Sequence, residues 1–379
     1  MKVVVAIDSF KGSLTSLEAG EAVQAGIRLA MPDAQVLVRP LADGGEGTAQ
    51  ALTLGMGGRV EKAWVTGPAG RPVECAYGIL DESGTAIIEM SGAAGITLVT
   101  GEERNPMHTT TYGVGEVIKD AIGKGCRRFI VGIGGSATND GGIGMLQALG
   151  SGLLNEKGEQ VAFGAKGLEE LASITDENVI PELRECAFRI ACDVTNPLCG
   201  ERGASAVYGP QKGATPDMVA QMDGWLGDYA RLAAAKTEKA NAAYPGTGAA
   251  GGLGFAFLTF TNAVLESGVK IVLEETKLEA CIEEADIVVT GEGRLDGQTV
   301  MGKAPIGVAG IAKKHGKTVL AFSGCVSEDA RACNGGGIDA YFPIVRGAVT
   351  LEEAMAPDNA RRNLTATVEQ VFRLIGRMR

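Results

Sequence analysis

Histidine is scarce in this sequence, with two residues among 379. His108 lies in a Pro-Met-His-Thr-Thr-Thr stretch, and His315 stands where a helix is expected to end. The serine elbow G-x-S-x-G is absent as well. A Ser-His-Asp hydrolase needs a catalytic histidine, and many such enzymes carry the elbow, so the sequence argues against this class.

The cysteines also lack a pattern that would bind metal or form a disulfide framework. Eight are scattered through the chain, and no two of them form a C-x-x-C pair. In a chain of this length they are typical of reduced thiols, which favours a cytoplasmic protein. The first ten residues contain an apolar run that stops at Asp8. We interpret them as a buried strand and not as a signal peptide.

A membrane span is not predicted either. Residues 240–265 carry no charged side chain, but they include Pro245, two asparagines and five glycines. Irregular backbone in lipid would leave its polar groups without partners. This segment is therefore interpreted as a Gly-rich loop that leads into a buried helix.

Charge and glycine content narrow the classes of ligand. The 46 acidic residues outnumber the 35 basic ones, which gives a net charge of −11. Nucleic acid and anionic membrane surfaces would be repelled, although a local group of donors can still bind a small anion. The 56 glycines have no G-X-Y period and occur in clusters, which indicates backbone that approaches a ligand closely.

Buried apolar strands alternate with helices at both ends of the chain, which is typical of a parallel sheet. Near the N-terminus a capping box, Thr15-x-x-Glu18, starts a helix that Pro32 ends. The strands expected in this sheet are residues 2–8, 35–40, 286–290, 318–322 and 341–345, and its later helices are residues 304–314 and 351–377.

The middle of the chain has a different pattern. Its expected strands are residues 59–66, 73–80, 85–90, 128–133 and 188–193, and its expected helices are residues 113–122, 141–149, 216–239 and 254–266. The first three strands form an antiparallel meander. The sequence therefore predicts two dissimilar α/β domains. A discontinuous Rossmann-like parallel-sheet domain, residues 1–65 and 285–379, would carry an inserted α/β domain with a mixed sheet, residues 66–284.

The segment Thr290–Thr299 (Thr-Gly-Glu-Gly-Arg-Leu-Asp-Gly-Gln-Thr) follows an expected strand. Ligands of open α/β sheets bind just past the carboxyl ends of the strands. Arg294 suits a carboxylate or phosphate, and Asp296 suits a proton or Mg²⁺. The alternative is a solvated loop.

The overlapping stretch Gly297–Ala304 nearly matches the P-loop pattern G-x-x-x-x-G-K-[ST]. Its last residue, Ala304, has no hydroxyl for Mg²⁺, so a true P-loop is not expected. Lys303 stands at a helix N-terminus and is a candidate phosphate contact. A solvated lysine is the alternative.

A second Gly-rich loop, Gly132–Gly142, lies between an expected strand and an expected helix. Its small residues allow backbone N–H groups to face a phosphate. The loop also fits the dinucleotide fingerprint G-x-G-x-x-A, which gives an NAD-dependent hydroxy-acid dehydrogenase as the alternative enzyme. The acid expected about 20 residues later would be Glu156, which stands in a predicted turn and weakens that alternative. A purely structural turn is the other alternative.

Other polar segments also follow expected strands. Asp193 precedes an Asn-Pro turn and suits metal binding or proton transfer, with a simple turn residue as the alternative. Gly209–Gly213 (Gly-Pro-Gln-Lys-Gly) follows it and receives no assigned role. Asp8–Ser13 places Lys11 ahead of a helix as an anion site. Ala42–Thr48 is expected at the same sheet edge, where its two acids could instead cap a helix.

Together the motifs resemble the bacterial glycerate kinase family, the glycerate 2-kinases. The resemblance runs from Lys2 to about Leu374 and rests on five motifs in order: Asp8-Ser-Phe-Lys-Gly-Ser, Ala42-Asp-Gly-Gly-Glu-Gly-Thr, Gly134-Gly-Ser-Ala-Thr-Asn-Asp-Gly, Cys192-Asp-Val-x-Asn-Pro-Leu and Thr290-Gly-Glu-Gly-Arg-x-Asp. It implies a cytoplasmic enzyme that transfers phosphate from ATP to D-glycerate with Mg²⁺ and yields 2-phosphoglycerate. It also implies an active site between two dissimilar α/β domains.

Phosphoryl transfer needs positioning and neutralised charge more than covalent chemistry. The candidates are Asp193, Asp296 and Lys11 for catalysis; Ser9, Lys11 and Arg294 for the substrate; Gly134, Gly135, Ser136, Thr138 and Lys303 for the nucleotide phosphates; and Asp193 and Glu292 for the metal. Which acid is the base stays open, and Asp8, Asp43 and Asp140 are the next acids to consider.

The expected partners are glycerate and ATP, with no nucleic acid and no membrane, and the sequence leaves open whether the chain forms a homodimer. A non-catalytic ligand-binding protein is a further alternative. It would not explain several acids and cations at strand ends.

Overall fold

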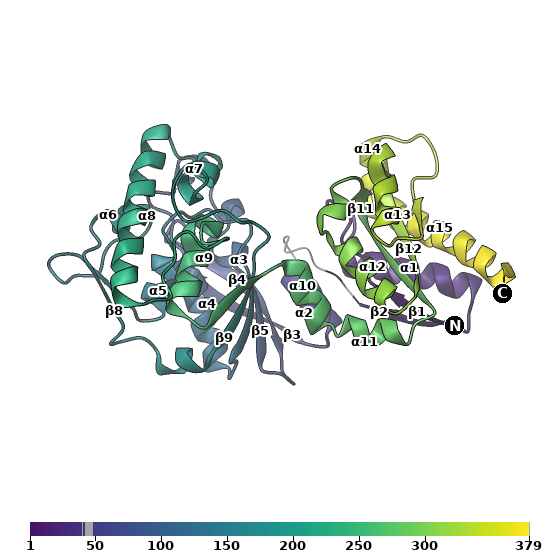
Figure 1. The fold of residues 1–379 in the computed structure, drawn as a ribbon, viewed down its shortest axis with the longest axis horizontal. Coiled ribbons are helices and arrows are strands. Elements are labelled where there is room, and N and C mark those ends of the chain that lie inside the picture. The colour runs from purple at the N-terminus through teal and green to yellow at the C-terminus, as the bar shows by residue number, and fades with distance from the viewer. Residues whose placement is uncertain (40, 42–47, 379) are drawn as a thin grey trace. The chain divides into compact units, whose positions relative to one another are not determined.

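The computed structural model describes residues 1–39, 41 and 48–378 of the chain. The expected motif at Ala42–Thr48, with Asp43 and Glu46, therefore lies outside the described residues except for the backbone of Thr48. The chain divides into two compact units, Met1–Asp43 with Val269–Arg379, and Gly44–Gly268. We refer to them as the first and second unit (Figure 1).

The boundaries of the units differ from the expected positions 65 and 285. Strand β3 (Arg59–Thr66) pairs along its whole length with β4 (Pro72–Leu80), so it belongs to the second unit. Helix α11 (Leu278–Glu283) packs on α12 (Ala304–Lys314) of the first unit. Pairing and packing, which no local pattern reveals, therefore set these two boundaries.

The first unit is an α/β structure around a five-stranded parallel sheet. Its strands are β1 (Lys2–Val5), β2 (Gln35–Val38), β11 (Ile287–Leu295), β12 (Thr318–Val326) and β13 (Ala340–Pro343). They lie in the order β13-β12-β11-β1-β2, and every neighbouring pair is parallel. Its helices are α1 (Ser16–Ala30), α10 (Gly268–Glu275), α11, α12, α13 (Ala332–Gly335), α14 (Leu351–Met355) and α15 (Pro357–Met378).

Strand β1 joins the two ends of the chain in this sheet. Val3, Val4 and Val5 pair with Ile287, Val288 and Val289 of β11. The prediction that residues 2–8 and 286–290 share a sheet is therefore confirmed. The predicted capping box is present too, because Thr15 and Glu18 exchange side-chain and backbone hydrogen bonds at the start of α1.

Apolar residues on both faces of the sheet explain why its strands read as continuous hydrophobic runs. Val3 and Val5 share a buried cluster with Val23 of α1 and Leu364 of α15. Val4 is equally buried. Helix α12 contacts β11 and β12 and buries Val308, Ala309 and Ala312.

Strand β11 is longer than expected. It continues through Leu295 and pairs with β12 as far as Val326, so the Gly-Glu-Gly-Arg part of the expected loop is extended sheet. Gly291 makes this pairing possible, because a Cβ at this position would lie 1.9 Å from the carbonyl oxygen of Phe322. Glu292 and Arg294 are thereby held on the rigid backbone of a strand.

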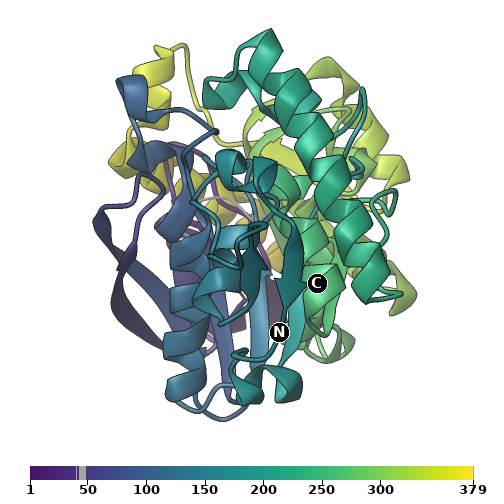
Figure 2. The same cartoon turned by 90° about the vertical axis from the view of Figure 1, so that its left-hand side faces the viewer.

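The strands of the second unit are β3, β4, β5 (Thr85–Glu89), β6 (Arg128–Gly132), β7 (Gly152–Leu154), β8 (Ser173–Thr175), β9 (Ala187–Ala191) and β10 (Ala263–Glu266). Six of them form a mixed sheet in the order β10-β9-β6-β5-β4-β3, and β7 and β8 pair in a separate two-stranded sheet. In the mixed sheet β3 and β4 form an antiparallel hairpin at one edge, β4 is antiparallel to β5, and β5, β6, β9 and β10 run parallel (Figure 2). The helices of this unit are α2 (Thr48–Gly55), α3 (Ser91–Ala94), α4 (Tyr112–Gly123), α5 (Ile143–Ala148), α6 (Ala165–Glu169), α7 (Ala204–Tyr208), α8 (Pro216–Lys236) and α9 (Ala249–Phe260).

Aromatic packing links the centre of this sheet to a buried helix. Phe129 of β6 and Phe188 of β9 stack with ring centroids 4.7 Å apart, and Phe257 of α9 lies 5.6 Å from Phe188. The expected helix over 254–266 is wrong in its last part. Residues 263–266 form β10, which pairs with β9, because Ala263 and Leu265 pack against the core of the sheet.

These units confirm the predicted fold class, a discontinuous parallel-sheet domain with an inserted mixed-sheet domain. No helix among the described residues combines the length and apolar character needed to cross a membrane.

Replacing Gly291 by alanine is expected to lower the free energy of unfolding by about 2 kcal/mol or more, because the added methyl group would overlap the Phe322 carbonyl. Chemical denaturation measures this. Gly310→Ala is the matched control. Gly310 lies in α12 with nothing within 4 Å of its Cβ position, so this change should be neutral or stabilising by about 0.5–1 kcal/mol. Equal destabilisation by both changes would contradict the packing argument.

Candidate functional site

In the first unit, charged residues gather at the carboxyl end of β11. Glu292 lies within the strand, and Asp296 follows its last residue. Lys303 is the N-cap of α12. Its Nζ lies 3.4 Å from Glu292 Oε2 and 3.8 Å from Asp296 Oδ1. One cationic atom therefore reaches both carboxylates.

Hydrogen bonds fix the positions of these two acids. Glu292 Oε1 accepts a bond of 2.7 Å from the hydroxyl of Thr299. Asp296 Oδ1 accepts a bond of 2.9 Å from the backbone N–H of Gln298, which makes a tight turn after the strand. Residues of the Gly297–Ala304 stretch, which nearly matches a P-loop, thus hold the two acids in place.

Burial raises the pKa of Glu292, and its bond from Thr299 and the charge of Lys303 act in the opposite direction. The side chain of Glu292 is buried, whereas Asp296 is only partly so. The cluster therefore combines a carboxyl group that holds its proton more strongly than usual with a more accessible acid.

The predicted substrate residues lie at the same edge of the sheet. Arg294 is exposed, and its Nε lies 3.5 Å from Asp296 Oδ2. The Ser9–Lys11 segment runs past Gly293, where a Cβ would meet Phe10 Cα at 3.4 Å and the Lys11 backbone nitrogen at 3.5 Å. Lys11 is exposed. The structure thus brings six of the predicted site residues together in the first unit: Ser9, Lys11, Glu292, Arg294, Asp296 and Lys303.

Asp8 has a structural position. It is 4% exposed, its backbone N–H donates to the carbonyl of Gly291, and its Oδ1 accepts from the backbone N–H of Ser9. It therefore shapes the turn that carries Ser9.

In the second unit, the Gly-rich loop follows β6. Gly134 and Gly135 are exposed, Ser136 is 8% exposed and Thr138 is fully buried. The hydroxyl of Thr138 has no hydrogen-bond partner among the described residues. Only the first part of the loop is therefore open to a ligand.

The start of α5 is not available for a phosphate. Asp140 is fully buried, and its carboxylate accepts bonds from the backbone N–H groups of Gly142 and Gly144 and from Thr111. The N–H of Met145 donates to the Thr111 hydroxyl. An internal acid thus occupies the donors that the sequence suggested for an anion. Burial raises the pKa of Asp140, and its hydrogen bonds oppose that rise.

Lys212 is a polar residue that sequence reasoning left without a role. It is 1% exposed, and its Nζ donates to Ser136 Oγ at 2.7 Å and to the Thr138 carbonyl oxygen at 2.6 Å. Burial lowers its pKa to about 7, while the charge of Asp140 raises it. The signal in the sequence was the segment Gly209–Gly213, in which a Gly-Pro pair precedes the lysine and a glycine follows it. A turn of this kind restricts the backbone and so fixes the direction of the lysine side chain.

Asp193 lies two residues beyond β9 and is exposed. Its Oδ1 accepts a bond of 3.1 Å from the backbone N–H of Gly268. Burial raises the pKa of the neighbouring Cys192 thiol, which agrees with a packed cysteine and not a nucleophile.

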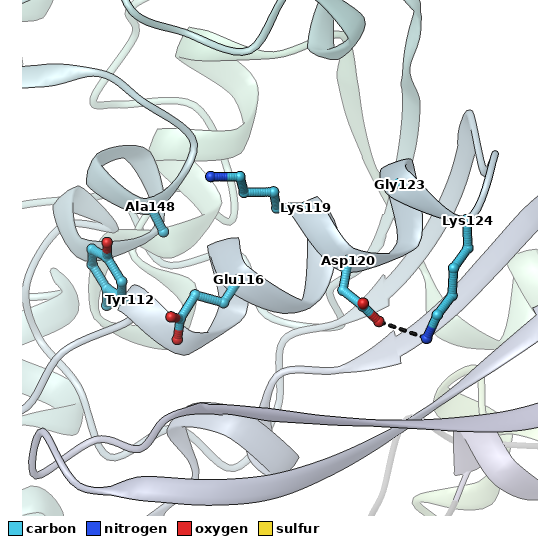
Figure 3. A pocket seen from close by; sticks show the side chains of 7 residues that line it. All are labelled: Tyr112, Glu116, Lys119, Asp120, Gly123, Lys124 and Ala148. Carbon is cyan, nitrogen blue, oxygen red and sulfur yellow. Dashed lines mark hydrogen bonds and ion pairs between the residues drawn. The ribbon is translucent and has the colours of Figure 1, made fainter.

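A separate hollow lies along α4 of the second unit (Figure 3). It is lined by Tyr112, Glu116, Lys119, Asp120, Gly123, Lys124 and Ala148. None of the predicted site residues lines it. Asp120 and Lys124 form an ion pair of 2.8 Å at its end.

The acids fit a magnesium site of the type completed by substrate. Mg²⁺ usually takes one or two protein carboxylates, with water and substrate phosphates as its other ligands. Among the described residues, no three His, Cys, Asp or Glu side chains form a ready metal cage. Glu292 and Asp296 supply two carboxylates within reach of one cation, as the position of Lys303 shows.

The fold is α/β, and each unit carries polar groups that suit an anionic ligand. One unit has acids and cations at the carboxyl edge of a parallel sheet, and the other has an open Gly-rich loop over a buried lysine. The chain belongs to the glycerate kinase family, whose sequence model matches residues 3–376.

Individual relatives agree with this membership. A glycerate kinase from Haemophilus influenzae is 45% identical over 375 residues, with 99% of each chain covered. A glycerate 2-kinase from Escherichia coli K12 is 45% identical over 373 residues, which cover 97% of this chain and 98% of the relative. A crystal structure from Salmonella typhimurium LT2, assigned as a glycerate kinase 2, matches with a TM-score of 0.92 and 45% identity over 99% of this chain and 98% of that one. The family resemblance is confirmed.

The dehydrogenase alternative receives no support. In the structure Glu156 lies in a turn after β7, where Asn155 Oδ1 accepts the N–H of Lys157, and not at the end of the strand where a ribose-binding acid is required. Helix α5 starts only at Ile143 with its donors occupied by Asp140 and Thr111.

The buried ammonium of Lys212 makes a pH-dependent contribution to stability. Its pKa in the folded protein lies below the value of 10.5 for a free side chain, so the unfolded chain binds more protons above pH 7. Stability from this group must therefore rise with pH. Between pH 7.0 and 8.5 the wild type should gain about 1.5 kcal/mol relative to Lys212→Met, as measured by urea unfolding. Parallel pH curves for the two proteins would contradict the assignment.

Proposed function

We propose that this protein transfers the γ-phosphoryl group of ATP to the 2-hydroxyl of D-glycerate, with Mg²⁺, in the cytoplasm. The observation that carries the proposal is full-length similarity to a relative named glycerate 2-kinase. The acid and lysine cluster at the end of β11 supports it, since this reaction needs a proton acceptor beside concentrated positive charge.

In this proposal the groups of the first unit bind and activate glycerate. Lys11 and Arg294 are exposed cations at one sheet edge, so they suit the substrate carboxylate, and Ser9 adds a hydroxyl. Asp296 accepts the proton of the 2-hydroxyl while the oxygen of that hydroxyl attacks the γ-phosphorus. The bond from that phosphorus to the bridging oxygen of ADP breaks, and ADP leaves.

The nucleotide phosphates would meet Gly134, Gly135 and Ser136 of the second unit and Lys303 of the first. The side chain of Thr138 is buried, so this residue would contribute only through its carbonyl oxygen, which accepts a hydrogen bond from Lys212. The proposed reaction therefore uses residues of both units. Glu292 would hold Mg²⁺, with Asp193 as the second ligand that the sequence suggests, and the metal would neutralise charge on the phosphates. Asp296 lies within reach of the same cation as Glu292 but is assigned here to the proton of the 2-hydroxyl. Asp193 remains the second candidate for the base.

A direct assay tests the activity. The protein should release ADP from ATP with D-glycerate and Mg²⁺, less with L-glycerate and hardly at all without acceptor. Phosphorus NMR should identify the product as the 2-phosphate. EDTA should abolish turnover, because the phosphate charge would lose its compensation. No ADP release from folded protein would refute the proposal.

Substitution of the acids tests their roles. Asp296→Asn keeps the shape and removes the charge, so kcat should fall by roughly 10²-fold or more if Asp296 is the base. Asp193→Asn should instead raise the Mg²⁺ requirement. Asp33→Asn, at an exposed turn before β2, is the control and should retain kcat. Near-normal kcat in Asp296→Asn, together with an unchanged Mg²⁺ requirement in Asp193→Asn and unchanged circular dichroism in both, would rule out both assignments.

A further inference from the structure

Lys212 has the unusual position of a cation beneath the open part of the Gly-rich loop. It lies in a 3₁₀ turn, Pro210–Lys212, and its side chain is almost fully buried. Lysine is rarely buried to this degree, because desolvation of the ammonium is costly. Its contacts with Ser136 and Thr138 are both at the loop.

The local sequence fixes this geometry. Pro210 is the first residue of the 3₁₀ turn, and Gly213 ends it with φ +93°. A Cβ at Gly213 would lie 2.0 Å from the carbonyl oxygen of Arg104, so no other residue fits there without a shift. Lys212 is held between these two constraints and has little freedom to leave the loop.

The hydrogen bond to Ser136 has a direction. An ammonium group only donates, so Ser136 Oγ accepts from Lys212 and uses a lone pair. The hydroxyl hydrogen of Ser136 then needs another acceptor. No hydrogen bond among the described residues uses it as a donor, and the two residues before it in the chain, Gly134 and Gly135, are exposed.

Lys212 forms no direct ion pair with another described residue, so its charge is not cancelled in that way. The nearby acid is Asp140, whose carboxylate oxygens accept bonds from Thr111, Gly142 and Gly144. Lys212 instead donates to a neutral hydroxyl and a neutral carbonyl. Its positive charge therefore remains available to an anion above the loop.

We propose that Lys212 is a positioning residue for the nucleotide: it orients the Ser136 hydroxyl so that its hydrogen is donated to a phosphate oxygen. The ammonium also places positive charge beneath that phosphate. This inference rests on the proposed function, because it takes Ser136 to be a phosphate ligand. It adds a group that the sequence motifs left without a role.

The test is a double-mutant cycle on ADP binding, measured by calorimetry at pH 6.5. Ser136→Ala and Lys212→Met should each raise the Kd for ADP about tenfold or more, as expected for loss of a charge-assisted hydrogen bond. The double variant should bind no more weakly than the worse single variant, since the lysine acts through the hydroxyl. In kinetics, the KM for ATP should rise while the KM for glycerate stays within about twofold. Lys212→Arg should recover part of the affinity.

Thr109→Val is the matched control. Thr109 is 1% exposed and donates a 2.9 Å bond to the carbonyl of Ala137, so this change removes a buried bond to the same loop without touching Ser136. It should lower the Tm and leave the Kd for ADP unchanged. An equal loss of affinity in Thr109→Val, or additive effects of the Ser136 and Lys212 changes, would overturn the inference.

The outcomes separate this inference from the proposed function. If Ser136→Ala weakens ADP binding and Lys212→Met does not, only the role of Lys212 fails. If Ser136→Ala has no effect, Ser136 is not a phosphate ligand. The roles assigned to Ser136 and to Lys212 then both fail, while the kinase activity is judged by its own assay. If wild-type protein binds no ADP, the kinase proposal itself is wrong. Should Lys212→Met not fold, Lys212→Gln, which can still donate to the Thr138 carbonyl, takes its place in the same cycle.

Discussion

The pairing of β1 with β11 is the constraint on which the first unit depends. The backbone N–H of Lys2 and the carboxylate of Asp286 are bonded across a separation of 284 positions. Closing so long a loop costs conformational entropy, but the cost grows only slowly with length, and the intervening residues form a compact unit of their own. Once the pairing forms, the Ser9–Lys11 segment and the acids of β11 lie at one sheet edge.

Both candidate sites contain charges that the fold buries only with compensation. Glu292 is bonded to Thr299 and lies near Lys303, and Lys212 donates to Ser136 and Thr138. A buried charge without such partners would be strongly destabilising. Glu292 lies within β11, and Lys212 lies in a 3₁₀ turn. Buried charges are expected at positions that carry chemistry at some cost in stability, which is the role proposed for both.

The sequence supports prediction of the elements better than of their partners. The capping box at Thr15, helix 304–314 and the β3–β5 meander follow from local periodicity and caps. The length of β11 does not, since it depends on how closely Gly291 approaches Phe322. The same limit affects the sites. Glu292, Arg294 and Asp296 are visible as a motif, whereas Lys212 gains its role only from contacts made across 74 and 76 positions.

The use of the α5 donors by Asp140 also constrains how this enzyme can hold a phosphate. A helix start attracts anions through free N–H groups, and here Gly142, Gly144 and Met145 already donate to internal acceptors. Under the proposed function, recognition at this loop would come from its exposed beginning and from a charge beneath it. A rigid hydroxyl over a buried ammonium would meet that requirement with little loss of side-chain entropy on binding. The same proposal would account for a costly buried lysine where an apolar residue would pack more easily.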